Sequence, residues 1–110
     1  MSYDYSAFLM KRHSAGLHDV TRDAVEVKSP PEVRALVSRA LTLNWQTDDR
    51  LDLPWGDGMV TLSIAGPVLG IQSHTSDIPS LAEKLAAVGF GVFDDQTGVV
   101  VAQPHPSERS

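Results

Sequence analysis

The chain has 110 residues, of which 42% are hydrophobic and 21% are charged, a composition typical of one folded domain with one core. Nine basic against fourteen acidic residues give a formal net charge of -5, which opposes binding to the phosphates of a nucleic acid or to an anionic membrane. Because the chain contains no cysteine, disulfides, thiolate metal ligands and cysteine nucleophiles are excluded.

The first residues do not have the pattern of an export signal. Asp4 precedes the apolar residues of this segment and the basic pair Lys11-Arg12 follows them, the reverse of the order in a secretory signal. No apolar run approaches the roughly 18 residues that a membrane-spanning helix requires. We therefore expect a cytoplasmic protein.

Residues 2–12 predict the first strand, because aromatic and apolar side chains alternate along the segment. Two registers are compatible with this alternation. Either Tyr3 and Tyr5 or Phe8 and Met10 could occupy the buried face, and the sequence leaves the choice open. Aromatic side chains on an exposed sheet face would form an apolar patch of the kind that marks interfaces. We therefore expect a homodimer that uses Tyr3, Tyr5 or Phe8.

Residues 13–28 have no convincing period and predict a long loop, although Val25 and Val27 favour a short extended piece near its end. Loops of this length are often functional or mobile, so length alone makes the segment a candidate site. It contains residue types that bind zinc or similar ions, namely His13, His18, Asp19 and Asp23. Their spacing matches no compact metal motif, and we expect a solvated loop without a metal or cofactor.

Two helices are predicted from their N-terminal signals and apolar stripes. The first begins at Ser29-Pro30-Pro31-Glu32, where serine and glutamate can form a capping box, and should end near Leu43. The second follows Ser76-Asp77 and should end at Gly89. The stripes consist of Val33, Leu36, Val37, Ala40 and Leu41 in the first helix and of Ile78, Leu81, Leu85 and Val88 in the second.

Two hairpins are predicted in the rest of the chain. Residues 58–75 alternate in two runs that Gly66-Pro67 separates, a pattern typical of an antiparallel hairpin. Residues 90–101 predict a closing hairpin in which Gly98 takes a positive φ. We expect one domain over residues 1–102, followed by a polar, disordered tail at 103–110.

The predicted order is therefore strand, helix, two strands, helix and two short strands. This order is typical of an α+β, ferredoxin-like fold built from split β-α-β units, here with an extra C-terminal hairpin strand. Right-handed crossovers would place both helices on one face of an antiparallel sheet. The opposite face would be exposed, covered by the long loops, or used for binding.

Residues 44–58 predict a short extended piece around Trp45 and then an acidic loop, since proline, glycine and aspartate oppose a helix. An aromatic anchor beside charges is a common way to bind another protein. Alternatively, one or both tryptophans of this segment cap the core, because tryptophan is largely buried on average. Our first hypothesis is a non-enzymatic interaction domain, immunity- or regulator-like, whose basic protein partner binds Trp45, Asp48, Asp49, Asp52 and Trp55.

Our second hypothesis is a small-molecule or metal-binding protein, or an enzyme, that uses the free face of the sheet. His13, His18 and His74 would then supply polar contacts, and the sequence leaves their role open. The chain has neither a G-x-S-x-G nucleophile motif nor a G-x-x-x-x-G-K-[ST] phosphate loop. We therefore assign no catalytic residue.

Both ends of the chain resemble those of a group of proteins. The opening Met1-Ser2-Tyr3-Asp4 and the closing Phe93-Asp94-Asp95-Gln96-Thr97-Gly98 are similar to small uncharacterised bacterial α+β proteins that begin M-S-Y-D and end in an F-D-P-Q-T-G or Y-D-P-Q-T-G hairpin. Asp95 stands where that pattern has proline. The resemblance covers the two ends and the helix-then-hairpin order between them. It implies a bacterial source, and it implies no activity or catalytic residue.

Overall fold

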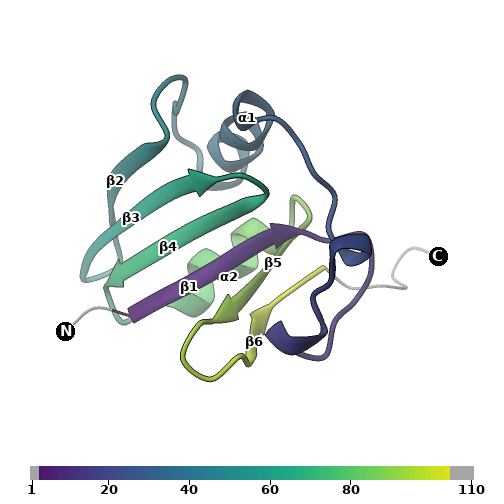
Figure 1. The fold of residues 1–110 in the computed structure, drawn as a ribbon. Helices are drawn as coiled ribbons and strands as arrows, with labels where there is room; N and C mark the ends of the chain where they lie inside the picture. The colour runs from purple at the N-terminus through teal and green to yellow at the C-terminus, as the bar shows by residue number, and fades with distance from the viewer. Residues whose placement is uncertain (1–2, 105–110) are drawn as a thin grey trace.

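The computed structural model describes residues 3–104, which form one antiparallel sheet of six strands and two α-helices (Figure 1). In chain order the elements are β1 (Tyr3–Leu9), α1 (Pro30–Leu41), β2 (Arg50–Trp55), β3 (Gly58–Ala65), β4 (Val68–His74), α2 (Ile78–Ala86), β5 (Phe90–Asp94) and β6 (Val100–Ala102). The strand order across the sheet is β2-β3-β4-β1-β5-β6. The predicted α+β class with an antiparallel sheet and two helices is confirmed.

The connections between the strands differ from the expected ferredoxin-like pattern. Strands β4 and β5 both pair antiparallel with β1 and flank it, so β4, α2 and β5 form one split β-α-β unit. On the other side of β1, three consecutive strands, β4, β3 and β2, form an antiparallel meander. The fold therefore contains a strand between α1 and β3 that the predicted order lacks.

That additional strand, β2, lies inside the segment for which the sequence predicts an acidic loop. It is an edge strand, which needs ladder hydrogen bonds on one side only, so Pro54 and the exposed Asp52 are tolerated there. Leu51, Leu53 and Trp55 alternate with these residues and pack against the core. The loop prediction was wrong here because it rested on residues that oppose a helix, and these residues do not exclude a strand at the edge of a sheet.

The helix signals are confirmed. In α1 the Ser29 backbone N–H donates to Glu32 Oε1 at 3.0 Å, as expected for the predicted capping box. The helix ends at Leu41, two residues before the predicted end, because Thr42 takes a left-handed conformation with a φ of 55°. The second helix, α2, ends at Ala86, three residues before the predicted end at Gly89, and Gly89 has a φ of 108° in the turn that follows.

One hydrophobic core joins the helices to one face of the sheet. The buried side chains of α1 and α2 belong to the same cluster as those of the central hairpin, in which Leu62 pairs with Ile71 and Ile64 with Leu69. In β1, Ala7 and Leu9 are buried in this cluster and Tyr5 packs against it, which settles the register that the sequence left open.

Because side chains alternate along a strand, Phe8 points to the opposite face from Tyr3 and Tyr5. The three aromatic residues therefore do not form one exposed patch. The homodimer stays a prediction.

Both predicted hairpins are present. Ala65 pairs with Val68 across Gly66-Pro67, and Phe93 pairs with Val100 in the closing hairpin, where Gly98 has a φ of 74°. None of the helices within residues 3–104 is long and apolar enough to cross a membrane. Residues 105–110 of the predicted tail lie outside the described residues.

Candidate functional site

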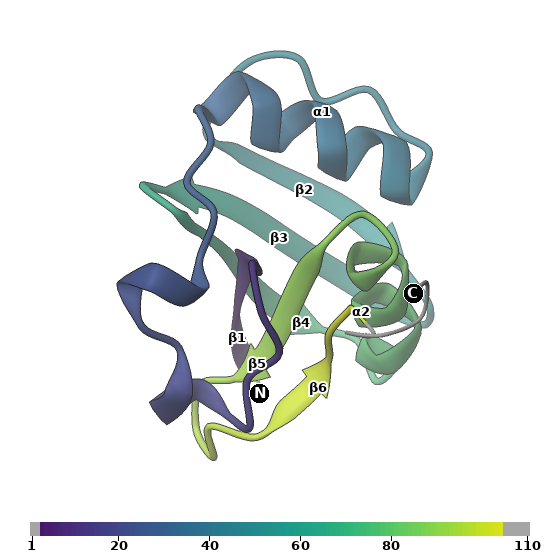
Figure 2. The same cartoon turned by 90° about the vertical axis from the view of Figure 1, so that its right-hand side faces the viewer.

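The connection between β1 and α1, residues 10–29, crosses the face of the sheet that the helices leave free. Figure 2 shows this dark blue segment on the opposite side of the sheet from α2. Two backbone hydrogen bonds join the start of the connection to residues near its end. The Lys11 N–H donates to the Ala24 carbonyl and the Glu26 N–H donates to the Leu9 carbonyl, both at 2.7 Å. An isolated β-bridge joins Met10 to Val25. The extended piece predicted near Val25 therefore closes the connection against β1.

The middle of the 10–29 connection is bound to the C-terminal part of the chain. The Ser14 N–H donates to Gln103 Oε1 at 2.9 Å, and Gln103 Nε2 donates to the Ser14 carbonyl at 2.7 Å. The Leu17 N–H donates to the Gly98 carbonyl at 2.8 Å. A Cβ atom at Gly16 would lie 2.9 Å from the same carbonyl oxygen, so this close approach requires glycine. These contacts hold the connection in one position on the sheet.

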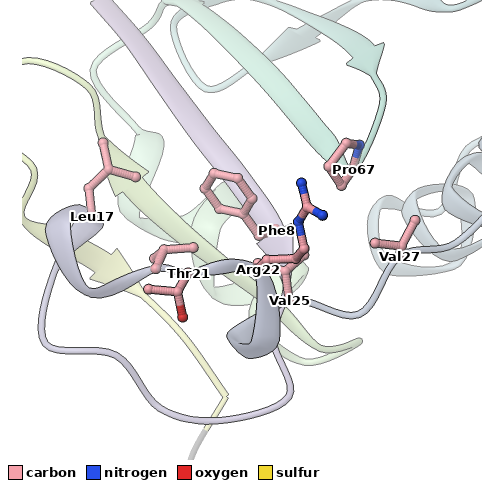
Figure 3. Close-up of a pocket in the computed structure, with 8 residues that line it drawn as sticks. Phe8, Leu17, Thr21, Arg22, Val25, Val27 and Pro67 are labelled. Carbon is pink, nitrogen blue, oxygen red and sulfur yellow. The ribbon is translucent and has the colours of Figure 1, made fainter.

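A cleft of about 500 Å³ lies beneath the anchored connection (Figure 3). We call it the loop–sheet cleft; its lining residues are Phe8, Leu17, Val20, Thr21, Arg22, Val25, Val27 and Pro67. Phe8 comes from β1, Pro67 from the turn between β3 and β4, and the other residues from the connection. The volume falls within the range of small-molecule sites, and six of the eight lining residues are apolar.

The base of the loop–sheet cleft is a second, smaller apolar cluster. Phe8 packs edge-to-face on Phe93, with ring centroids 6.1 Å apart and an interplanar angle of 61°. Phe93 is fully buried although it lies on the face of β5 that points away from the helices. Val25 is also buried. The cleft is therefore built on close-packed side chains.

Comparison of this chain with protein-family models, with curated proteins and with solved structures finds no match. The site is therefore interpreted from its own residues. Within residues 3–104 no group of three or more histidine, aspartate or glutamate side chains could hold a metal ion. His13 and His18 are exposed on the connection, and His74 is exposed at the end of β4. None of these histidines lines the loop–sheet cleft.

The two tryptophans of the predicted partner site have structural contacts. Trp45 is 4% exposed and belongs to the core, and its backbone N–H donates to Ser38 Oγ at 3.0 Å. Trp55 is half-buried, and its indole N–H donates to the Asp77 carbonyl at 3.1 Å, just before α2. Trp45 and Trp55 thus connect the 44–58 segment to the two helices.

The three aspartates of the same predicted site are exposed, and each makes a contact within the chain, Asp48 through its backbone carbonyl and Asp49 and Asp52 through their carboxylates. The Asp48 carbonyl accepts a hydrogen bond of 3.2 Å from Arg34, and Asp49 Oδ1 lies 3.5 Å from the same guanidinium. Asp52 Oδ1 accepts from the Thr61 hydroxyl at 2.7 Å on the free face of the sheet. Asp49 precedes β2 and Trp55 ends it, which separates them by about 20 Å along an extended strand. The five predicted residues do not converge on one point.

Asp57, the fourth acidic residue of the segment, stabilises the β2–β3 turn. Its carboxylate accepts hydrogen bonds from the Ser76 N–H, the Thr75 hydroxyl and the Ser76 hydroxyl, at 3.0, 2.8 and 3.1 Å. These donors, the Ser76 N–H first among them, lower the pKa of Asp57 to about 2. The ionised carboxylate therefore ties the turn to the residues before α2 and is not free to act as a general acid or base.

Proposed function

We propose that the protein binds a small apolar molecule in the loop–sheet cleft. This proposal develops the second sequence hypothesis and moves its site from the histidines to the apolar residues of the 10–29 connection. The observation that carries it is the cleft of about 500 Å³ with Phe8 at its base. Clefts of this size with mostly apolar walls are typical of small-molecule sites.

The anchored connection supports this proposal because it makes the cleft preformed. Hydrogen bonds at both Ser14 and Lys11 hold the segment before any ligand arrives, so little conformational freedom is lost on binding. Each methylene group that a ligand buries contributes about 0.8 kcal/mol. A modest alkyl or aryl group is therefore sufficient for measurable affinity.

The test measures the binding of the neutral dye Nile red, which fluoresces in apolar surroundings, by variants at two exposed valines. Val27 is 69% exposed and lines the cleft, whereas Val99 is 59% exposed and does not. Val27→Asp places a charge in the apolar wall and should weaken dye binding about tenfold. Val99→Asp, the matched control, should leave it unchanged. Equal effects of the two substitutions, or no binding by the unmodified protein, would contradict the proposal.

A second candidate function is the immunity- or regulator-like domain of the first hypothesis. It is favoured by the exposure of Asp48, Asp49 and Asp52, which a basic protein surface could contact. The buried Trp45 adds no area to that surface, so recognition would depend on the carboxylates. Reversing the three charges to lysine should abolish capture of a basic partner, whereas Glu83→Lys on α2 should not. Capture that survives the triple reversal would contradict this function.

A further inference from the structure

Arg22 lines the loop–sheet cleft and differs from the other lining residues in its charge. It is the one charged residue among the eight that line the cleft. In Figure 3 its guanidinium group lies between Phe8 and Pro67, at the junction of the connection with the sheet. Arg22 is exposed to solvent and also lines the cleft, as is usual for a long side chain whose apolar stem borders an apolar wall. This geometry places a positive charge at the mouth of an apolar site.

Several neighbouring charges of the connection already have partners. Arg12 lies 3.6 Å from Asp19, and Lys28 lies 3.2 Å from Glu26. The Asp23 carboxylate accepts a hydrogen bond from the Thr21 hydroxyl, which holds the pKa of Asp23 below its ordinary value. In the described part of the chain, Arg22 makes neither an ion pair nor a side-chain hydrogen bond. Its donors are therefore available to a ligand.

We infer that the ligand of the loop–sheet cleft is an amphipathic monocarboxylate, whose carboxylate pairs with Arg22 and whose apolar tail lies against Phe8 and Val25. This inference rests on the proposed function and adds the class of ligand. The planar guanidinium presents its donors in a fork that matches the two oxygens of a carboxylate. A single cation in an otherwise uncharged wall, on a chain of net charge -5, favours one negative charge over the two of a phosphate monoester.

The test uses two probes of equal chain length, octanoate and 1-octanol, whose binding is measured by displacement of Nile red at neutral pH. The unmodified protein should bind octanoate about fivefold more tightly, the upper range for a solvent-exposed ion pair. Arg22→Gln should remove this preference and leave the affinity for 1-octanol unchanged. Lys11→Gln is the matched control, because it removes the same charge from the connection at a residue that does not line the cleft. It should retain the preference.

The possible outcomes distinguish the inference of a monocarboxylate ligand from the proposed function on which it rests, the binding of a small apolar molecule. Equal affinities for octanoate and 1-octanol in the unmodified protein would overturn the monocarboxylate and leave the apolar site in place. A preference that survives Arg22→Gln, or one that Lys11→Gln removes equally, would also overturn it, since the carboxylate would then not pair with Arg22. Failure of both probes to displace the dye would overturn the proposed function itself. The melting temperatures of both variants establish that each is folded.

Discussion

Replacing Trp45 by alanine is expected to lower the free energy of unfolding by about 3 to 5 kcal/mol. Trp45 is 4% exposed and packs in the cluster that joins α1 to the sheet, so its removal leaves a large cavity. A surface anchor for a partner protein would behave differently, because exposed substitutions usually change stability by less than about 0.5 kcal/mol. Urea denaturation followed by far-ultraviolet circular dichroism measures the loss without relying on tryptophan fluorescence.

A more conservative variant is the control for this prediction. Trp45→Phe keeps much of the buried aromatic volume and removes the indole N–H, which is buried without a hydrogen-bond partner among residues 3–104. Because an unsatisfied buried donor is itself unfavourable, this variant should lose far less stability than Trp45→Ala. A loss below about 1 kcal/mol in Trp45→Ala would contradict the assignment of Trp45 to the core.

Phe93→Ala is expected to lower the free energy of unfolding by a similar amount, about 3 to 5 kcal/mol, and also to weaken binding in the loop–sheet cleft. Phe93 is fully buried and supports Phe8, whose ring lines the cleft. Without Phe93, the Phe8 ring loses its packing partner and the base of the cleft is no longer fixed. Denaturation measures the first effect, and Nile red titration of the folded variant measures the second.

The neighbouring Phe90 provides a matched control for this experiment. Phe90 is 1% exposed, lies on the same strand, and packs in the main core on the helix side of the sheet. Phe90→Ala should therefore lose comparable stability while the folded fraction keeps its affinity for the dye. Equal losses of affinity in the two variants would show that the cleft responds to stability in general. That result would contradict the role given to the Phe8–Phe93 pair.

Sequence alone predicted those elements whose signals are local. The Ser29–Glu32 capping box, the Gly66-Pro67 turn and the Gly98 turn depend on hydrogen bonds and backbone angles within a few residues. The alternation within residues 58–75 also predicted the central hairpin, because its period distinguishes the buried face from the exposed face. These features therefore agree between the sequence and the structure.

The sequence predicted a loop in place of β2, because strand formation in that segment depends on its position in the sheet. Pro54 and Asp52 are unfavourable in a central strand and acceptable at an edge, and only the complete strand order shows which of the two applies. The burial of Trp45 confirms the alternative that one or both tryptophans cap the core, but the sequence did not predict the contacts that bury it. Its sequence neighbourhood is polar, and its burial depends on the way in which the 42–49 segment folds back along α1, where Ser38 binds its backbone.

For the candidate site, the length of the 13–28 segment was the one signal present in the sequence; it indicated the connection that borders the loop–sheet cleft but not the residues that line the cleft. Composition, turns, caps and alternation determined an α+β domain with an antiparallel sheet, because each is set by chemistry over a few neighbouring positions. Tertiary structure alone brought together Phe8, Arg22 and Pro67, which are far apart in the chain. Their meeting depends on strand order and on the hydrogen bonds of the connection to residues near 100, which no local pattern encodes.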